Sequence, residues 1–393
     1  MTQARRVAIL GGSRIPFCRN NTAYFDLGNV GMSIKAVGSL VEKFKLSGVQ
    51  LGEVALGAVL KHSSDWNIGR EVTLSSGLSP LTPGITMQRA CGTSLDTSIH
   101  IGNKIALGQI EAGIAGGSDT TSDVPIVVGD KLRRRLLNIN RAKTLGQRLM
   151  MAKEWGITRE SQDQLAFESH RKAAAAYERG FFKDLVVPFR GVERDNILRA
   201  DTTIEKLATL KPAFDRSSGK GTLTAGNSTP LTDGASAVLL GSEAWAQERG
   251  LKPLAYLTHS RAAAVDFVAG EGLLMAPTIA VADLLKATGL SLQDFDFYEI
   301  HEAFAAQVLC TLKAWESADY CSKRLGLAKP LGAIDPTKLN VVGSSLAFGH
   351  PFAATGARII ATAAKLLDEK GGGRALISVC TAGGMGVVAI VER

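Results

Sequence analysis

Several features that mark membrane, secreted or nucleic-acid-binding proteins are missing from this sequence. No apolar run reaches the roughly 18 residues of a membrane-spanning helix, and the N-terminus lacks the apolar segment of a signal peptide. The five cysteines form no CxxC pair and are odd in number, which argues against a disulfide framework or a zinc site. Aromatic residues make up only 6% of the chain and no basic motif interleaves with them, so we expect no nucleic-acid partner. These absences favour a cytoplasmic protein with free thiols.

The composition that remains is typical of an α/β enzyme scaffold. Hydrophobic residues make up 45% of the 393 positions, and 42 positions are glycine, which indicates a compact chain rather than a disordered or fibrous one. A chain of this length exceeds what one hydrophobic core supports, so two or three subdomains are expected. The formal net charge of +8 fits an anionic partner but does not identify it.

Apolar runs that end in glycine-rich turns alternate with helix-like segments. Strands are predicted at residues 6–10, 53–60, 111–117, 221–227, 235–240, 296–300, 375–379 and 387–391, and helices at 31–47, 92–109 and 351–369. This alternation predicts a mixed, largely parallel sheet covered by helices. The order of elements around Cys91 recurs around His350, which indicates a weak internal duplication.

Residues 121–220 differ in character from the rest and are predicted to form an insertion that lies over the sheet. Within it, Thr158 is a predicted N-cap for a helix over residues 161–177. Residues 131–143 are rich in arginine and lysine. By default such a stretch is the solvated face of a helix, and a membrane or phosphate contact is the alternative.

The stretch at residues 88–94 is the first candidate for chemistry. It places Cys91 where a turn leads into a helix, and the positive end of the helix macrodipole stabilises a thiolate. Gly92 removes a side chain where a substrate could approach. The alternative is a buried structural cysteine, which is the better interpretation unless a base and an oxyanion site exist elsewhere.

Three stretches near the C-terminus supply those missing groups. They are His301-Glu302-Ala303-Phe304-Ala305 after a strand, Gly349-His350-Pro351 before a helix, and the glycine-rich loop that begins at Cys380. Each histidine alone could cap or pack, and Cys380 alone could be a core residue. Together with Cys91 they provide a nucleophile, a base, a second thiol and a loop of free backbone N–H groups, all at the ends of elements.

This set of motifs resembles the thiolases over essentially the whole chain. The motifs occur in the family's order: Arg14-Ile15-Pro16-Phe17, Cys91-Gly92-Thr93, Ala115-Gly116-Gly117, Thr224-Ala225-Gly226-Asn227, Asp233-Gly234-Ala235, His301-Glu302-Ala303-Phe304, Gly349-His350-Pro351 and the Cys380 loop. The resemblance implies an α/β fold of two similar βαβαβαββ halves in five layers with an inserted loop domain. We expect residues 1–120 with 221–245 to form the first half, 121–220 the loop domain and 246–393 the second half.

The implied activity is exchange of an acyl group between coenzyme A and a 3-ketoacyl thioester, with coenzyme A as a substrate and no permanently bound cofactor or metal. Carried over by position, Cys91 is the acylated nucleophile and His350 takes its proton. Cys380 is the acid and base for the leaving enolate and the incoming coenzyme A. His350 and a water held by His301 bind the enolate oxygen, and the N–H groups of Cys91 and Ala382 form the oxyanion hole. Such preorganised donors stabilise the transition-state charge by a few kcal/mol each.

Two residues that differ from the commonest family pattern indicate which subgroup the chain resembles. Many members carry Asn at the position of His301 and Gly at that of Ala382, whereas the residues found here resemble the β-oxidation thiolases of trifunctional complexes. That subgroup also has a basic stretch like residues 131–148, proposed to meet a membrane or a partner. The resemblance therefore implies degradation of longer chains, a homodimer or tetramer, and a partner subunit with hydratase and dehydrogenase activities.

A third difference is a deletion, since the family's glycine-containing segment before Met150 is absent. Either this loop is short, or residues are missing between Leu149 and Met150, and we expect the second. Other functions remain open. They are an acetoacetyl-CoA thiolase working in the condensing direction and a catalytically silent acyl-CoA-binding subunit. A ketosynthase is disfavoured because that class lacks the second cysteine that Cys380 provides.

Overall fold

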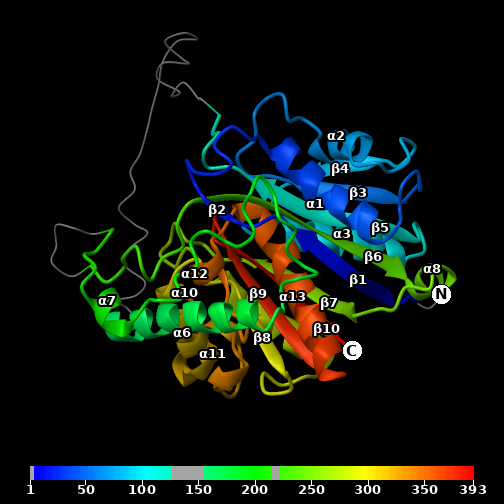
Figure 1. The fold of residues 1–393 in the computed structure, drawn as a ribbon. Helices are drawn as coiled ribbons and strands as arrows, with labels where there is room; N and C mark the ends of the chain where they lie inside the picture. Colours follow the sequence, from blue (N-terminus) through cyan, green and yellow to red (C-terminus); the bar gives the residue numbers. More distant parts are fainter. Residues whose placement is uncertain (1–3, 126–154, 215–220) are drawn as a thin grey trace, which may run out of the picture.

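The computed structural model describes residues 4–125, 155–214 and 221–393 (Figure 1). The first half contains β1 (Val7–Arg14), β2 (Cys18–Arg19), α1 (Asn29–Lys43), β3 (Glu53–Gly57), α2 (Ile68–Ser75), β4 (Gly84–Met87), α3 (Thr93–Ala106), β5 (Ala112–Asp119) and β6 (Thr232–Ser242). Between β5 and β6 lie α6 (Arg159–Glu178) and α7 (Ile204–Ala208). No helix of the described residues has the length and apolar character needed to cross a membrane.

The second half repeats the plan of the first. After α8 (Glu243–Glu248) it contains β7 (Ala255–Ala264), α9 (Ala276–Thr288), β8 (Phe297–Ile300), α10 (Ala305–Glu316), α11 (Ala318–Leu325), η2 (Pro336–Lys338), α12 (Ser345–Phe348), η3 (Phe352–Ala354), α13 (Thr355–Lys370), β9 (Arg374–Thr381) and β10 (Met385–Glu392). Leu339 takes the place of β4, since it forms a single parallel bridge with Tyr298 of β8. The expected duplication is therefore visible as two runs of βαβαβαββ.

The strands join in the order β4-β3-β5-β6-β1-β7-β10-β9-β8, with β2 attached to β6. The two halves meet where β1 pairs with β7 over two residue pairs. The expected mixed sheet is confirmed, but the expectation that it is largely parallel is wrong. Only β3–β4, β3–β5 and β8–β9 are parallel among the described pairs. The rest are antiparallel because the last two strands of each half run in opposite directions and the first strand pairs beside them.

Alternating strand residues build three apolar layers, and these layers define the five-layer arrangement. Ala8 and Leu10 of β1 pack with α1 on one outer face, whereas Val7 and Ile9 face the central helices α3 and α13. In the second half, Val387 of β10 faces the same central helices, whereas Val388 and Ile390 of β10 face α9 on the other outer face. The five layers are thus an outer helix layer, a sheet, the central helices α3 and α13, a second sheet and the other outer helix layer.

The structure corrects one predicted strand and confirms a predicted helix start. Residues 221–227 form a turn rather than a strand, because the Asn227 side chain accepts from the Thr224 N–H at 2.7 Å and closes the backbone on itself. Thr158 caps α6 as expected, accepting from the Ser161 N–H. Among the described residues of 121–220, α6 and α7 occur without a sheet strand, and α6 packs on α10 and α12 (Figure 1). The three domain boundaries remain a prediction.

Candidate active site

Cys91 lies in the turn between β4 and α3, as the sequence predicts. Ala90 has a φ of +42°, an uncommon left-handed value for a residue with a side chain. The turn is held by Thr93, whose Oγ1 accepts from the Arg89 N–H at 2.8 Å and donates to the Ala90 carbonyl at 2.7 Å. This constrained turn leaves the Cys91 side chain partly exposed at the start of the helix.

Gly92 is required by packing between the two halves. A Cβ at this position would lie 2.8 Å from Thr381 Cγ2 and 3.0 Å from Val387 Cγ2. Thr381 belongs to β9 and Val387 to β10. The space that we expected a substrate to use is therefore filled by the second half of the chain. The first-half nucleophile is thereby fixed against the strands that carry Cys380.

The second half places His301 and His350 beside each other. His301 follows the last residue of β8, and its N–H donates to the Ser378 carbonyl at 2.8 Å. His350 follows Gly349, which has a φ of +92°, and its N–H donates to Thr232 Oγ1 at 2.8 Å. The Nε2 atoms of the two imidazoles lie 3.2 Å apart, within hydrogen-bond distance.

The thiol of Cys91 meets these imidazoles at the junction of the two halves. Its sulfur and one nitrogen from each of His301 and His350 all lie within 4.8 Å of one another. A thiol and two imidazoles are also possible ligands of zinc. However, the hydrogen bond between the imidazoles already accounts for their close approach. The arrangement is suited to moving a proton from the sulfur to an imidazole.

The loop after β9 completes the arrangement. The backbone N–H groups of Ala382 and of Cys91 itself lie near enough to the Cys91 sulfur to favour its thiolate form. Cys380 is buried, and the charge of Cys91 is among the causes that raise its pKa, so the two thiols lie close to each other. A second thiol and two converging N–H donors therefore surround the first thiol, as the resemblance implies.

Burial keeps this cluster uncharged in the absence of substrate. Burial raises the pKa of Cys91 to about 11, although the N–H of Ala382 opposes the shift. Burial lowers the pKa of His350 to about 3 and lowers that of His301 well below its usual value. Burial of Cys91 therefore opposes the thiolate that the helix macrodipole favours.

Three polar residues that orient the site were not predicted. Ser345 Oγ lies 2.8 Å from His301 Nδ1, and Thr355 Oγ1 lies 2.5 Å from His350 Nδ1. Asp119 at the end of β5 accepts from the Leu60 N–H at 2.7 Å and the Ala353 N–H at 2.8 Å. It thereby ties the first half to the turn behind His350. Only the position of Asp119 after a glycine-rich strand gave a signal in the sequence.

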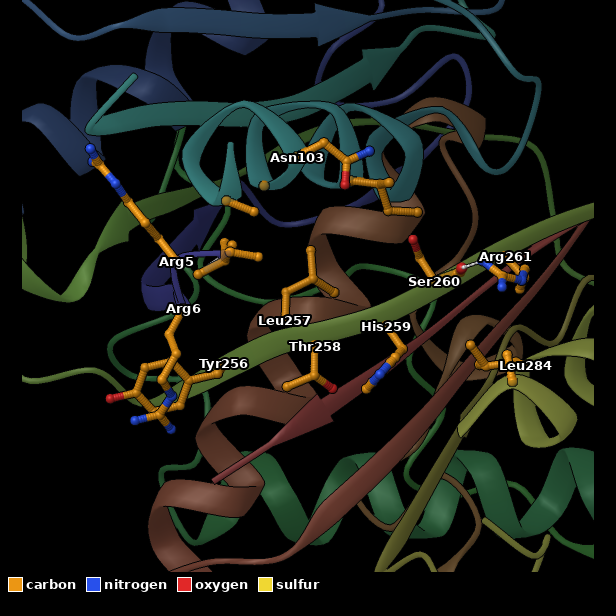
Figure 2. Close-up of a pocket in the computed structure, with 16 residues that line it drawn as sticks. Arg5, Arg6, Asn103, Tyr256, Leu257, Thr258, His259, Ser260, Arg261 and Leu284 are labelled. Atoms are coloured by element: carbon orange, nitrogen blue, oxygen red, sulfur yellow. Dashed lines mark hydrogen bonds between the residues drawn. The ribbon is translucent and has the colours of Figure 1, made fainter. Parts of the chain in front are cut away.

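A surface pocket of about 400 Å³ lies elsewhere, between β7, α3 and α9 (Figure 2). Two of its basic residues, Arg5 and Arg6, are paired with Glu111 and Glu243. None of the cysteines or histidines proposed for the chemistry lines it. We therefore place the reaction at the thiol–imidazole cluster.

Two features of the sequence lie outside the described residues. They are the basic stretch 131–148 and the join between Leu149 and Met150. Both remain predictions, and the cluster described above depends on neither.

Known proteins resemble this chain over nearly its whole length. The family model "Thiolase, N-terminal domain" matches residues 7–244, and "Thiolase, C-terminal domain" matches residues 251–393. A 3-ketoacyl-CoA thiolase of Serratia proteamaculans is 39% identical, with 98% of this chain and 97% of that protein covered. One of Shewanella sediminis is 38% identical, with 100% and 98% covered. The Bacillus anthracis acetyl-CoA acetyltransferase structure has a TM-score of 0.84 at 31% identity, with 100% of both chains covered.

The alignment with the Serratia protein spans 425 positions, more than the 393 residues of this chain. That relative therefore has residues without a counterpart in this chain. Two family models that together cover nearly the whole sequence, and relatives of similar length, agree with the motifs and the two-half fold. The chain belongs to the thiolase family.

Proposed function

We propose that this protein is a 3-ketoacyl-CoA thiolase, which uses coenzyme A to cleave a 3-ketoacyl-CoA into acetyl-CoA and a shortened acyl-CoA. The observation that carries the proposal is the convergence of Cys91, His301, His350 and Cys380 from both halves of the chain. The relatives named 3-ketoacyl-CoA thiolase support the same assignment. Coenzyme A acts as a substrate, and no permanently bound cofactor is needed.

The first half-reaction breaks a carbon–carbon bond. His350 takes the proton of Cys91, and the thiolate attacks the 3-keto carbon. The N–H groups of Cys91 and Ala382, which both reach the sulfur, hold the resulting oxyanion. When the oxyanion collapses, the bond between C2 and C3 breaks, its electron pair enters the enolate of acetyl-CoA, and Cys380 protonates that enolate. The shortened acyl group remains on Cys91.

The second half-reaction releases the acyl group. The thiolate of Cys380 takes the proton of the incoming coenzyme A, whose sulfur attacks the acyl carbon. Cys91 leaves as a thiolate and recovers its proton from His350. Each proton that enters the cycle is returned, so the enzyme ends in its neutral resting state.

The imidazoles hold the thioester oxygen on which the enolate charge develops. A Claisen bond breaks only if that charge is stabilised, and a buried donor in a site of low dielectric does so more strongly than water. His350 provides such a donor once it carries the proton of Cys91. His301 lies beside it and acts on the same oxygen, directly or through a water.

The physiological setting that fits best is fatty-acid β-oxidation in the cytoplasm. His301 and Ala382 support it, because these residues resemble the subgroup that degrades longer chains with a partner subunit carrying hydratase and dehydrogenase activities. A homodimer or tetramer, and peripheral membrane contact through residues 131–148, belong to the same proposal.

The second candidate is an acetoacetyl-CoA thiolase that works in the condensing direction. The similarity to the Bacillus anthracis acetyl-CoA acetyltransferase favours it. Rates of coenzyme A-dependent cleavage of acetoacetyl-CoA and of a series of longer 3-ketoacyl-CoA substrates separate the two. We expect kcat/KM to rise with chain length. A preference for acetoacetyl-CoA would support the second candidate, and no cleavage of any member would indicate a silent subunit.

A further inference from the structure

Behind the two imidazoles lies a buried chain of hydrogen bonds that ends in a guanidinium group. Ser345 Oγ lies 2.8 Å from His301 Nδ1 and 3.0 Å from Arg358 Nη2. On the other side, His301 Nε2 meets His350 Nε2, and His350 Nδ1 meets Thr355 Oγ1. All five side chains are buried. The chain therefore runs from Arg358 through both imidazoles to Thr355 and is shielded from bulk water.

The guanidinium group fixes which atom of each pair carries the hydrogen. An arginine side chain has donors but no acceptor, so Arg358 donates to Ser345 Oγ. Among the described contacts, the other partner of that oxygen is His301 Nδ1. The hydroxyl hydrogen of Ser345 finds an acceptor among these contacts only if it points to His301 Nδ1, which then accepts it.

The assignment of His301 Nδ1 as an acceptor also determines which nitrogen of His350 carries a hydrogen. A neutral imidazole carries one hydrogen, so that of His301 lies on Nε2 and is donated to His350 Nε2. The hydrogen of His350 consequently lies on Nδ1 and is donated to Thr355 Oγ1. Both imidazoles are neutral because burial, aided by the charge of Arg358, lowers their pKa values. His350 Nε2 is thus the unprotonated nitrogen, and the single lone pair with which it accepts from His301 is the one that takes the proton of Cys91.

We propose that Arg358 is a positioning residue that acts through Ser345: it holds His301 as the Nε2–H tautomer and His350 as the Nδ1–H tautomer, so that His350 Nε2 is ready to act as the base. The role in catalysis rests on the proposed thiolase function. The two tautomers themselves do not depend on it.

The surroundings of Arg358 keep its side chain a hydrogen-bond donor to Ser345. Burial lowers its pKa to about 10, a shift that the charge of Glu299 opposes, so the side chain stays cationic at neutral pH. Its Nη2 also donates to Ser344 Oγ at 3.3 Å, and its Cζ lies 5.6 Å from the centre of the Phe348 ring. Of its two hydroxyl contacts, the one with Ser345 at 3.0 Å is the shorter.

The donors and acceptors in this chain of hydrogen bonds change during the reaction. When the proton of Cys91 moves to His350 Nε2, the electron pair of the S–H bond stays on the sulfur. His350 Nε2 then no longer accepts from His301. The Nε2–H of His301 is released, so both imidazoles present an N–H to the thioester oxygen. A base in the resting site thereby becomes a pair of donors at the moment when negative charge develops.

The tautomers can be measured directly by ¹⁵N NMR of the histidine side chains, because protonated and unprotonated ring nitrogens have different shifts. The chain has six histidines, so the signals of His301 and His350 can be assigned from variants of each. We expect hydrogens on His301 Nε2 and His350 Nδ1 in the intact protein. A hydrogen on His301 Nδ1 would overturn the proposal, whether or not the protein cleaves 3-ketoacyl-CoA.

Variants test the role of the donor. Ser345→Ala and Arg358→Gln should each mix the tautomers and lower kcat by about 10²–10⁴-fold, as when a catalytic imidazole loses its correct tautomer. Arg358→Lys keeps a group that only donates and should retain the wild-type tautomers. Ser344→Ala is the matched control, because it removes a hydroxyl that contacts Arg358 but not His301.

These variants also separate the two proposals. Unchanged tautomers in folded Ser345→Ala would overturn the inference while leaving the thiolase assignment intact. Absence of thiolysis by a wild-type protein with the expected tautomers would instead overturn the function and leave the positioning of the imidazoles standing.

Discussion

The thiol of Cys91 is subject to two opposing influences. The N–H groups of Ala382 and of Cys91 itself favour the thiolate, whereas burial disfavours it and prevails. The same burial favours the neutral form of the His350 imidazole. A neutral thiol beside a neutral imidazole avoids the cost of holding an ion pair in a poorly solvated site. The thiol becomes a nucleophile when it gives its proton to the imidazole and attacks the substrate.

The rate of alkylation of Cys91 should therefore rise with pH through a midpoint above the value of about 8.5 for a free thiol. The direction follows from the raised pKa, because only the thiolate reacts and its fraction at neutral pH falls as the pKa rises. Mass spectrometry of iodoacetamide-labelled peptides across a pH series measures this midpoint. The urea-unfolded protein serves as the control and should return to about 8.5. A midpoint below that value in the folded protein would show that a thiolate–imidazolium pair exists before substrate binds.

The reactive side chains could be predicted from the sequence, but the groups that orient them could not. Cys91, His301, His350 and Cys380 lie in short motifs at the ends of predicted elements, and glycine or proline adjoins Cys91 and His350. Ser345 and similar partners carry no such signal, because a serine becomes an orienting group only through a contact in three dimensions. The burial that opposes a thiolate at Cys91 also carries no signal in a local motif.

At the level of elements, the site depends on how closely α3 and α13 approach. A Cβ on Gly356 would lie 2.2 Å from the backbone nitrogen of Leu95, so glycine at this crossing allows the two central helices to touch. The Ala357 N–H also donates to Ser94 Oγ at 2.8 Å across the same contact. Because α3 follows Cys91 and α13 follows His350, this crossing sets the spacing of the nucleophile and its base.

Gly356→Ala should destabilise the protein by about 1–3 kcal/mol through overpacking and should also lower turnover. Gly38→Ala in α1 is a matched control, because its new Cβ would have a nearest neighbour at 4.0 Å. That change should stabilise the helix by about 0.5–1 kcal/mol and leave turnover unchanged. Denaturant unfolding and thiolysis assays on both variants measure these effects. Equal stability and activity of the two variants would contradict the close crossing.

Elements with continuous apolar runs, such as β5 and β10, could be predicted, whereas elements shaped by their neighbours could not. The strand β4 has four residues, and the pairing of β3 beside it decides its conformation. The strand β7 is largely exposed and lacks a continuous apolar run. Residues 221–227 were wrongly predicted as a strand, since the side chain of Asn227 gives that backbone a turn.

At the scale of the whole molecule, the duplicated fold places one reactive turn from each half at a shared junction. Cys91 precedes α3 in the first half, and His350 precedes α13 in the second. Neither half holds a complete set of groups, because the second thiol and both imidazoles belong to the second half. The reaction therefore requires both halves, which is consistent with family models that together span almost the entire chain.

The basic stretch at residues 131–148 is predicted to attach the molecule to an anionic surface or a partner subunit. Changing Arg133, Arg134, Arg135, Arg141 and Lys143 to Gln should abolish binding to anionic vesicles or to the partner, measured by co-sedimentation. Thiolysis of short soluble substrates should survive. Added salt should weaken the binding, because exposed charges are screened over about 8–10 Å at physiological ionic strength. Binding that is unaffected by salt or by these changes would leave the stretch as an ordinary solvated surface.

The central claim is that Cys91 carries the acyl group, and trapping that intermediate tests it most directly. The protein is incubated with a 3-ketoacyl-CoA in the absence of free coenzyme A, and its peptides are weighed by mass spectrometry. We expect an acyl group on Cys91 that disappears when coenzyme A is added, and no acyl group in Cys91→Ala. Cys380→Ala should still bind substrate but turn over about 10²–10⁴-fold more slowly, since it lacks the acid and base. An acyl group on Cys380, or turnover by Cys91→Ala, would contradict the account.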